Sequence, residues 1–558
     1  MNHWGFTLRQ PILQAAKATV KTTLRTRIGT AAVVLAMTAA AAPAQAAPAA
    51  NSFDSGLNVS NPLPVPDLKP AASQQKTLVI GLDGIRWDRV QAANTPNIKK
   101  ILNEGASALS YTFAPANGAG TVNLAPTVSG PSWSSILTGV WPDKHGVKDN
   151  SFKGKKFDQY PDFLIRAEQA KPALSTFAAA DWQPIAMEAG GGPIINKDID
   201  YRYGSAASGT RYLSEDAREA DLTARTIYEK RTDISFIYMG APDENVSGGV
   251  FGSAYKNALE ATDKNVGAML RAIESSPSFG SEDWRVILTN DHGLTDGGSH
   301  GNGTTLNERA VYTAVYTPGK NTGQVRYDLK PVDIAPTVLK RAGVAIDPAW
   351  GFDGQPVDEL QPDAFDSLRS VLQNKKTEPE IPADLKGYTQ TAPSGWSIDN
   401  SKMPTGGVPE WYGWTFTTNE FWSSPADDKN QGRENFVRGR DVIAVADSDA
   451  WDDLNLPKSS RAFDSTLYTP TYDAAGSASV TLDYQTQYQH ESGQVAQVVA
   501  RWDNGSSSIV KSYSTTTAGP EKLSVKVPAG ARSVQFGFRY AGTNNWFWAL
   551  DQVSVTKS

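Results

Sequence analysis

The chain has 558 residues, with 53 lysines and arginines against 59 aspartates and glutamates, and it contains no cysteine. Its 15 Trp, 19 Tyr and 19 Phe supply more buriable aromatic surface than a disordered polymer carries, which excludes disorder over most of the chain. The length allows two or more domains, each with its own core. Without cysteine there are no disulfides, thiolate zinc ligands or cysteine nucleophile, so any metal or nucleophile chemistry must use oxygen and imidazole.

Residues 1–46 have the pattern of an export signal. Five basic residues precede an apolar run over 28–42, and Ala44-Gln45-Ala46 matches a cleavage signal. The run is short and rich in alanine, so an uncleaved membrane anchor is the less favoured alternative, and no transmembrane helix is expected in the mature chain. Removal of this segment takes the net charge from −6 to −11, which argues against a broad nucleic-acid-binding surface. Export without disulfides is typical of a secreted bacterial protein, periplasmic or extracellular.

The composition divides the rest of the chain into three parts. Residues 47–75 are rich in proline, alanine and serine and are predicted to form a linker. Over 76–374, short apolar runs alternate with helical patterns, which predicts an α/β sandwich around a mostly parallel sheet. Over 375–558, alternating segments rich in Trp, Thr, Ser and Gly predict an all-β, jelly-roll-like sandwich.

Within the α/β part, a short helix is expected to open at Ser129, with a proline in its first turn and Gly139 after its end. Three buried strands are predicted over 78–82, 234–238 and 286–289, each a short and largely apolar run. A long helix is predicted over 256–273, where apolar residues recur at helical spacing.

A carboxylate follows each of the three strands within a few residues. Asp83 follows the first strand, Asp243 the second, and Asp291 with His292 the third. Ligands of open α/β sheets bind outside the carboxyl ends of the strands, so these side chains are expected to converge at one edge. A glycine-rich loop lets His300 fold back onto the same edge. Three Asp and two His are the ligand types that suit zinc or manganese when thiolates are absent.

Ser129 is the candidate nucleophile. A serine at the start of a helix lies where the dipole and the backbone N–H groups favour negative charge, which suits an alkoxide and a bound phosphate. A neighbouring metal ion promotes deprotonation of the hydroxyl without a histidine partner. The alternatives are an ordinary helix N-cap for Ser129 and turn residues for the aspartates, which are the commoner roles of such residues taken singly.

Several short motifs stand in a distinctive order along the chain. They are Gly81-Leu82-Asp83-Gly84, Ser129-Gly130-Pro131, Thr138-Gly139, Trp141-Pro142-Asp143-Lys144-His145-Gly146-Val147, Pro242-Asp243, Thr289-Asn290-Asp291-His292-Gly293, Gly298-Ser299-His300-Gly301, Val332-Asp333-Ile334-Ala335-Pro336-Thr337-Val338-Leu339 and Gly351-Phe352-Asp353-Gly354. This order resembles the alkaline phosphatase superfamily, and most of all its nucleotide pyrophosphatase/phosphodiesterase (type I phosphodiesterase) branch. The resemblance covers 76–372 and implies an alkaline-phosphatase-like α/β/α fold with metal-dependent hydrolysis of phosphate esters.

Carried over by position, the resemblance implies two divalent metal ions, with zinc as the expected metal. One ion would be held by Asp83, Asp291 and His292 and would activate Ser129. Ser129 would attack phosphorus in line and form a phosphoseryl intermediate, which water then hydrolyses. Ser132 is a further candidate for contact with the phosphate.

The second ion would be held by Asp243 and His300, together with a histidine that the family places four residues after the aspartate. Ser247 occupies that position here and is a far weaker zinc ligand than imidazole. The second site is therefore expected to bind loosely, to use Glu244 or Asn245, to take Mg²⁺ or Ca²⁺, or to be partly empty.

Four functions remain open, of which phosphodiester or nucleotide pyrophosphate hydrolysis is favoured. An alkaline phosphomonoesterase is the first alternative, because the diesterase branch more usually has Thr at the nucleophile and Asn three residues later, where this chain has Ser129 and Ser132. A sulfatase-like hydrolase is the second, although Trp133 replaces the arginine of that pattern. The last is a degenerate catalytic domain that presents a glycan- or cell-wall-binding C-terminal module, which the departure at Ser247 supports.

Overall fold

The computed structural model describes residues 52–115, 123–377, 381–424, 431–454, 457 and 460–557. The predicted export signal, 1–46, lies outside the described residues. The chain from Ser52 onwards forms one compact unit. Within the described ranges, no helix combines the length and the apolar character that a membrane span needs.

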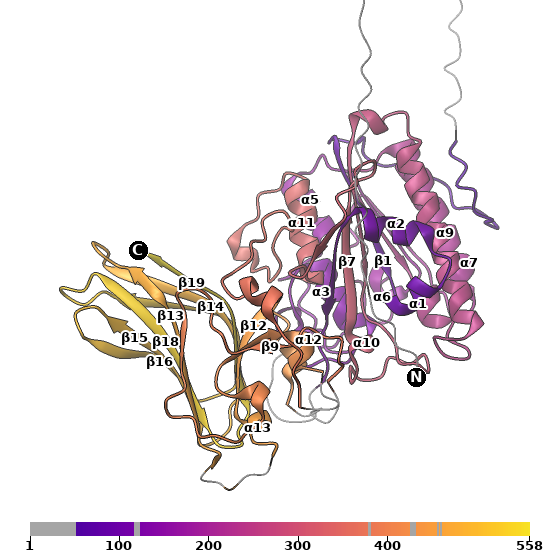
Figure 1. Ribbon diagram of the computed structural model, residues 1–558. Coiled ribbons are helices and arrows are strands. Elements are labelled where there is room, and N and C mark those ends of the chain that lie inside the picture. The colour runs from indigo at the N-terminus through magenta and orange to yellow at the C-terminus, as the bar shows by residue number, and fades with distance from the viewer. Residues whose placement is uncertain are drawn as a thin grey trace, which may run out of the picture. The chain divides into compact units, whose positions relative to one another are not determined.

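An eight-stranded sheet organises the α/β part, in the order β4-β3-β5-β1-β6-β7-β2-β8 (Figure 1). Strand β1 (Gln75–Leu82) is flanked by parallel β5 (Ile234–Met239) and β6 (Asp283–Asn290). Among the described strands of this sheet, only β7 (Ala310–Tyr316) runs against its neighbours. The others are β2 (Ala106–Tyr111), β3 (Thr176–Ala180), β4 (Tyr201–Gly204) and β8 (Gln324–Arg326). The predicted mostly parallel sheet and its three central strands are confirmed.

Helices cover both faces of this sheet, as Figure 1 shows. Because side chains alternate along a strand, Leu78 and Ile80 of β1 belong to one hydrophobic cluster and Val79 to another. The first cluster includes α2 (Pro96–Glu104), α7 (Arg211–Lys230) and α9 (Ser253–Glu274), and the second includes α3 (Ser129–Thr138), α5 (Phe163–Ala170) and α11 (Ile334–Arg341). The α/β/α arrangement is confirmed, and the helix predicted over 256–273 lies within α9.

Short helices complete the α/β part. They are α1 (Trp87–Ala92), α4 (Pro142–His145), α6 (Gln183–Ala186), α8 (Ala241–Glu244), α10 (Leu306–Arg309), η1 (Phe279–Ser281), η2 (Pro331–Asp333), η3 (Pro348–Trp350) and η4 (Asp366–Val371). Helix α3 ends at Gly139, whose φ of 74° is the left-handed conformation that glycine adopts without strain. The predicted short helix at Ser129 and its glycine stop are therefore confirmed.

Two antiparallel sheets form the C-terminal part. One consists of β10 (Ser397–Asp399), β13 (Phe463–Asp473), β18 (Ser533–Gly542), β15 (Val495–Trp502) and β16 (Ser507–Tyr513). The other consists of β17 (Thr517–Lys526), β14 (Ser479–Tyr488), β19 (Phe547–Lys557), β12 (Val442–Asp447), β11 (Thr415–Thr418) and β9 (Tyr388–Thr389). Among the described residues, short helices accompany them, namely α12 (Asn419–Trp422), α13 (Ser448–Trp451), η5 (Pro409–Trp411) and η7 (Arg433–Asn435). The predicted β-sandwich is confirmed.

The tryptophans of this sandwich contribute to its core. All eight lie in the described part of the chain; seven are buried, and the eighth, Trp546, is partly buried against the same hydrophobic cluster. The buried ones are Trp396, Trp411, Trp414, Trp422, Trp451, Trp502 and Trp548. None of these tryptophans is therefore an exposed platform on which a glycan could stack.

Residues 52–74, predicted to be a linker without a core, pack against the α/β part. The Ser55 hydroxyl donates a hydrogen bond to Asp221 of α7 over 2.6 Å, and the Phe53 ring stacks on Tyr228 at 5.0 Å between centroids. Asp233 accepts hydrogen bonds from two backbone N–H groups of the same segment, both over 2.9 Å. The ordered chain therefore begins well before residue 76, because polar anchors hold a sequence that has no regular secondary structure.

Candidate metal centre and nucleophile

Asp83 and Asp291 lie at the carboxyl ends of adjacent strands. Asp83 directly follows β1 and Asp291 directly follows β6, so the register of the two strands places both residues at the same edge of the sheet. One ligand atom each of Asp83, Asp291 and His292 lies within 4.8 Å of the others, and all three residues are buried. The sheet topology therefore brings together the residues expected for the first metal ion.

A second group adjoins the first. It consists of Asp243, His292 and His300, whose ligand atoms again lie within 4.8 Å of one another. Asp243 belongs to α8, which follows β5, and its Oδ2 lies 3.1 Å from His300 Nε2. A Cβ at Gly84 would lie 2.4 Å from Asp243 Oδ1, so glycine lets the turn after β1 approach α8 closely. His292 belongs to both groups.

Buried ligand atoms without partners show that the donor set fits metal ions. Among the described residues, Asp83 Oδ1, Asp243 Oδ1, Asp291 Oδ2 and His292 Nε2 are buried and have no hydrogen-bond partner. A buried polar atom left unpaired costs about 1–3 kcal/mol, so four of them at one place need an explanation. His292 Nδ1 lies 3.0 Å from the Gly293 carbonyl and must donate to it, which leaves the Nε2 lone pair for a cation.

The protonation equilibria of Asp83, Asp291 and His292 also favour a bound cation. Burial, reinforced by the charge of Asp243, raises the pKa of Asp83 to about 7. Burial and the charge of Asp83 raise the pKa of Asp291 well above its usual range. Burial, and then the charge of His300, lower the pKa of His292 to about 4, so its imidazole is neutral and able to act as a ligand. A divalent cation relieves the repulsion among these carboxylates.

Metal affinity is expected to increase with pH through about 7, and to rise further towards pH 9, because the hydrogen bond to Asp243 raises the pKa of His300 to about 9. Asp83, whose pKa is raised to about 7 by burial and by Asp243, must release its proton before it binds a cation. Protons therefore compete with the metal below this pKa, and each displaced proton lowers the apparent affinity about tenfold per pH unit. Calorimetric zinc titrations of the metal-free chain on both sides of pH 7 measure the effect. Equal affinities on the two sides would contradict it.

Two buried donors orient Asp83. Trp133 Nε1 donates to Asp83 Oδ2 over 3.1 Å, and the Tyr238 hydroxyl donates to the same oxygen over 2.7 Å. Both bonds use Oδ2, which leaves Oδ1 as the unpartnered atom of the metal group. The apolar sequence around these two residues indicated only a buried strand and a buried helix, so no sequence signal marked them as partners of a ligand.

Ser129 is the first residue of α3 and is buried, at 6% exposure. One turn along the helix, Trp133 contacts Asp83, as described above. On the other side of Ser129, the Thr127 hydroxyl donates to the His300 carbonyl over 2.9 Å. Ser129 is therefore held between a residue bonded to the first metal group and a residue bonded to the loop of the second.

Two further polar side chains accompany the first turn of α3. Ser132 Oγ is buried and unpartnered among the described residues, and it lies three residues after Ser129, on the same helix face. Asn150 Oδ1 accepts a hydrogen bond from the Gly130 N–H over 2.7 Å. With Oδ1 engaged, the amide nitrogen of Asn150 is the group that can donate to a ligand. The sequence analysis singled out Ser132 but missed Asn150, which stands in no pattern typical of a helix or strand.

Ser247 does not complete either group. Its side chain is exposed after the end of α8, and the second group is formed by Asp243, His292 and His300 without it. The two substitutes considered for it have other partners, because Glu244 accepts a hydrogen bond from the Gly209 N–H over 3.3 Å and Asn245 donates one to the Ala241 carbonyl over 2.8 Å.

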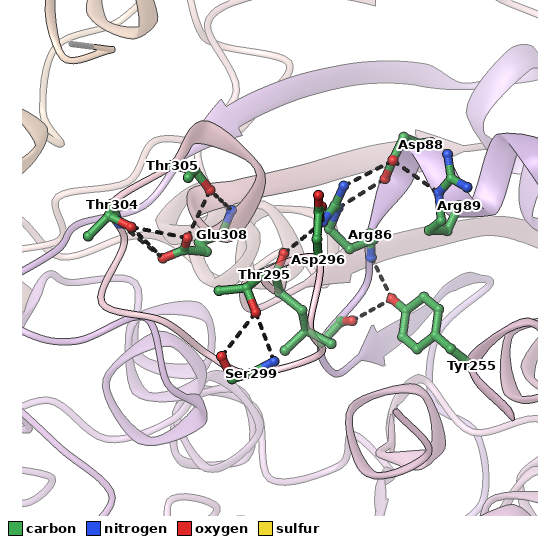
Figure 2. Close-up of polar contacts among 12 residues, drawn as sticks. Arg86, Asp88, Arg89, Tyr255, Thr295, Asp296, Ser299, Thr304, Thr305 and Glu308 are labelled. Atoms are coloured by element: carbon green, nitrogen blue, oxygen red, sulfur yellow. Dashed lines mark hydrogen bonds and ion pairs between the residues drawn. The ribbon is translucent and has the colours of Figure 1, made fainter. Parts of the chain in front are cut away.

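The loop that carries His300 is held by a buried glutamate, as Figure 2 shows. Glu308 is 1% exposed, and its carboxylate accepts hydrogen bonds from the backbone N–H groups of Asn302 and Thr304, over 3.2 and 3.0 Å, and from the Thr305 hydroxyl over 2.9 Å. These bonds fix the backbone directly after His300. Glu308 therefore positions a ligand without touching the metal group itself.

Arg86 links the turn that carries Asp83 to the loop after His292 (Figure 2). Its guanidinium donates to the Leu294 carbonyl over 3.0 Å and pairs with Asp296 at 2.9 Å. The Tyr255 hydroxyl accepts from the Arg86 N–H and donates to the Gly84 carbonyl, both over 2.7 Å. These bonds fix the turn after β1 against the loop after β6, although the two segments are about 200 residues apart in the chain.

Replacing Glu308 by glutamine is expected to weaken metal binding at the Asp243 and His300 group by about 10- to 100-fold, as changes to partners of metal ligands typically do. The amide keeps the size of the side chain but turns one acceptor into a donor facing backbone N–H groups. Zinc titration, with circular dichroism as the check of folding, measures the loss. Glu359→Gln is the matched control, since Glu359 is half exposed and pairs with Lys340 at the surface. A folded Glu308→Gln variant with unchanged affinity would refute the positioning role.

The sequence model of the type I phosphodiesterase / nucleotide pyrophosphatase family matches residues 77–439, a range that includes every candidate site residue. Ectonucleotide pyrophosphatase/phosphodiesterase family member 7 of Mus musculus is 23% identical over 242 residues, which are 40% of this chain and 51% of that protein. Bis(5'-adenosyl)-triphosphatase ENPP4 of Bos taurus is 25% identical over 241 residues, or 40% and 49% of the two chains. The chain spans about half the length of the curated relatives it matches.

Solved structures with a similar arrangement include two enzymes of low identity. Murine ectonucleotide pyrophosphatase / phosphodiesterase 5, in complex with AMP, is 12% identical with a TM-score of 0.35, covering 49% of this chain and 96% of that one. The phosphonate monoester hydrolase of Agrobacterium radiobacter is 14% identical with a TM-score of 0.39, covering 51% and 76%.

Proposed function

The chain belongs to the type I phosphodiesterase / nucleotide pyrophosphatase family, and we propose that it is an exported hydrolase of phosphodiester or phosphoanhydride bonds with Ser129 as its nucleophile. The observation that carries the proposal is the set of four buried, unpartnered ligand atoms at the edge of the sheet. The bonds of Thr127 to the His300 carbonyl and of Trp133 to Asp83 support a place for Ser129 near these groups. The pyrophosphatase and triphosphatase names of the relatives support a nucleotide-like substrate class.

Two divalent cations are part of the proposal. Asp83 and Asp291 would hold the first and Asp243 and His300 the second, and the one free lone pair of His292, at Nε2, would complete the ligands of one of them. Oxygen and imidazole donors without thiolate suit zinc. Such cations, when bound, polarise the phosphoryl oxygens and favour the deprotonated form of a nearby hydroxyl.

The residues of the chain supply the nucleophile and its orientation. Ser129 Oγ attacks phosphorus in line, so that the bond to serine forms while the bond to the leaving oxygen breaks. Water then cleaves the phosphoserine and returns the free hydroxyl. The Ser132 hydroxyl and the Asn150 amide would donate to the non-bridging oxygens, and the dipole of α3 would favour their negative charge.

Relative rates on a simple aryl phosphodiester and its matching monoester test this function, with zinc present and Ser129→Ala as the blank. Faster hydrolysis of the diester, abolished in the variant, is the expected result. A preference for the monoester would identify a phosphomonoesterase, the alternative that serine at positions 129 and 132 favours. Absence of Ser129-dependent hydrolysis of either ester would favour a sulfatase-like enzyme or a binding protein.

A further inference from the structure

A separate cavity lies where the α/β part meets the segment before β12. Its volume is about 140 Å³, and none of the candidate site residues lines it. The motifs Trp141–Val147 and Gly351–Gly354, which the proposed reaction does not use, contribute to its walls. Its basic lining residues are Lys144, Lys330, Arg438 and Arg440. So many cations around one small cavity raise the question of what balances their charge.

Two of these cations are neutralised by aspartates of the same motifs. Arg438 pairs with Asp143 at 2.9 Å and with Asp353 at 3.1 Å. Lys144 also pairs with Asp353, at 2.7 Å. Both acids are therefore already engaged by these two side chains.

Arg440 is neutralised as well, and Lys330 is not. Arg440 forms a two-pronged ion pair with Asp333, with N–O distances of 2.7 and 2.8 Å. The Lys330 side chain lines the cavity and is only 6% exposed, yet within the described residues its ammonium forms no hydrogen bond and no ion pair. Three acids thus pair with three of the four cations, and among the described residues Lys330 is the cation of this cavity without an ion pair.

Unused arginine donors border the same space. Arg438 uses its Nε and Nη2 groups in ion pairs, and Arg440 uses Nη1 and Nη2. In the described structure, Arg438 Nη1 and Arg440 Nε therefore keep N–H groups without an acceptor. These N–H groups and the Lys330 ammonium belong to residues that line the cavity, so a small anion inside it could accept hydrogen bonds from them.

We propose that this cavity binds one small tetrahedral oxyanion, of the inorganic phosphate or sulfate type, between Lys330, Arg438 and Arg440. The volume of about 140 Å³ corresponds to roughly four or five water molecules at about 30 Å³ each, which is room for one oxyanion and a water. It is well below the roughly 300 Å³ at which pockets for drug-sized ligands begin, which favours a small anion over a whole nucleotide. Guanidinium and ammonium groups together are the usual ligands of such anions.

Within the described residues, no carboxylate forms an ion pair with Lys330. Asp551 is buried nearby and has one unpartnered oxygen, but it lines the neighbouring cavity. Burial and the charge of Asp363 raise the pKa of Asp551 well above the usual range, which weakens it as a counter-charge for Lys330. Burial lowers the pKa of Lys330 to about 8, which keeps the ammonium protonated at neutral pH.

Thermal unfolding of the full chain tests the proposal, after treatment with EDTA to remove metal-bound phosphate. Inorganic phosphate is expected to raise the melting temperature above that in sodium chloride of equal ionic strength, in proportion to ln(1 + [phosphate]/Kd). Lys330→Met is expected to lower the apparent phosphate affinity at least about tenfold, whereas Lys330→Arg keeps it. Lys320→Met, which removes an exposed lysine, is expected to behave as the wild type.

The outcomes separate this site from the active site. If phosphate raised the melting temperature of Lys330→Met as much as that of the wild type, or if sodium chloride had the same effect as phosphate, the oxyanion site would be overturned. Sodium sulfate is tested in the same way. A rise in melting temperature with phosphate alone, or with both phosphate and sulfate, supports the site and identifies the anion. Lys330→Met is expected to hydrolyse the aryl phosphodiester at the wild-type rate, so failure of the proposed function is measured independently.

A folding defect does not obscure the result. Removal of an unpaired buried charge is expected to leave Lys330→Met at least as stable as the wild type without phosphate. A selenate soak of wild-type crystals provides a second measurement. An anomalous peak in the cavity supports the site, and a cavity that contains only water refutes it.

Discussion

Replacing Ser129 by alanine is expected to lower kcat/KM for an aryl phosphodiester by at least about 10³-fold, because the variant has no hydroxyl to attack phosphorus. The metal groups are expected to survive the change, since Asp83, Asp291 and His292 do not depend on Ser129 for their hydrogen bonds. Steady-state kinetics with metal analysis of the same preparation measures both effects. Loss of activity with retained metal is the expected combination.

Two companion variants show whether Ser129 is the nucleophile or only a neighbour. Ser129→Thr keeps a hydroxyl at the first position of α3 and is expected to retain part of the activity. Ser132→Ala removes the unpartnered hydroxyl one turn away and is expected to cost about 10- to 10³-fold, as the loss of one donor to a phosphoryl oxygen does. If Ser132→Ala were inactive and Ser129→Ala were active, the nucleophile would have to be reassigned.

Replacing Asp291 by asparagine is expected to reduce zinc affinity by more than about 100-fold and to abolish hydrolysis. Asp291 Oδ1 is held by the Gly84 N–H over 3.2 Å, while Oδ2 is unpartnered and lies 3.1 Å from His292 Nε2. The carboxylate therefore faces the group that the metal would occupy, and an amide cannot provide the same charge. Zinc titration of the two proteins measures the difference.

Stability without metal should change in the opposite direction. Burial and Asp83 raise the pKa of Asp291 above its unfolded value, so its contribution to stability is present at low pH and is lost as the pH rises through the folded pKa. Asp291→Asn removes this loss and is expected to be at least as stable as metal-free wild type near neutral pH. Saturating zinc, at about 100 times Kd, stabilises the wild type by about 2.7 kcal/mol and the variant far less.

Ser247→Ala is the matched control for Asp291→Asn. Ser247 is exposed and lies outside both groups of ligand atoms, so metal affinity and activity are expected to stay within about twofold of wild type. A loss of zinc comparable to that of Asp291→Asn would show that Ser247 is a ligand after all.

The sequence by itself predicted the elements and the edge of the sheet where the chemistry gathers. Apolar runs predicted β1, β5 and β6, and helical spacing predicted α9, because these patterns depend only on neighbouring residues. Parallel strands end at one edge, so Asp83 and Asp291 could be placed together although they are 208 positions apart. The glycine after α3 also followed from local backbone preference.

Only the tertiary structure decided which side chains complete these local features. His292 belongs to both metal groups, Tyr238 and Trp133 orient Asp83, and Glu308 fixes the His300 loop. Likewise, nothing local indicated that Lys330 lacks a partner. Such contacts join residues that are distant in the chain, and they depend on packing and burial that no local pattern specifies. The sequence determined the strands and the ligand types, and the folded chain determined their partners and their charge balance.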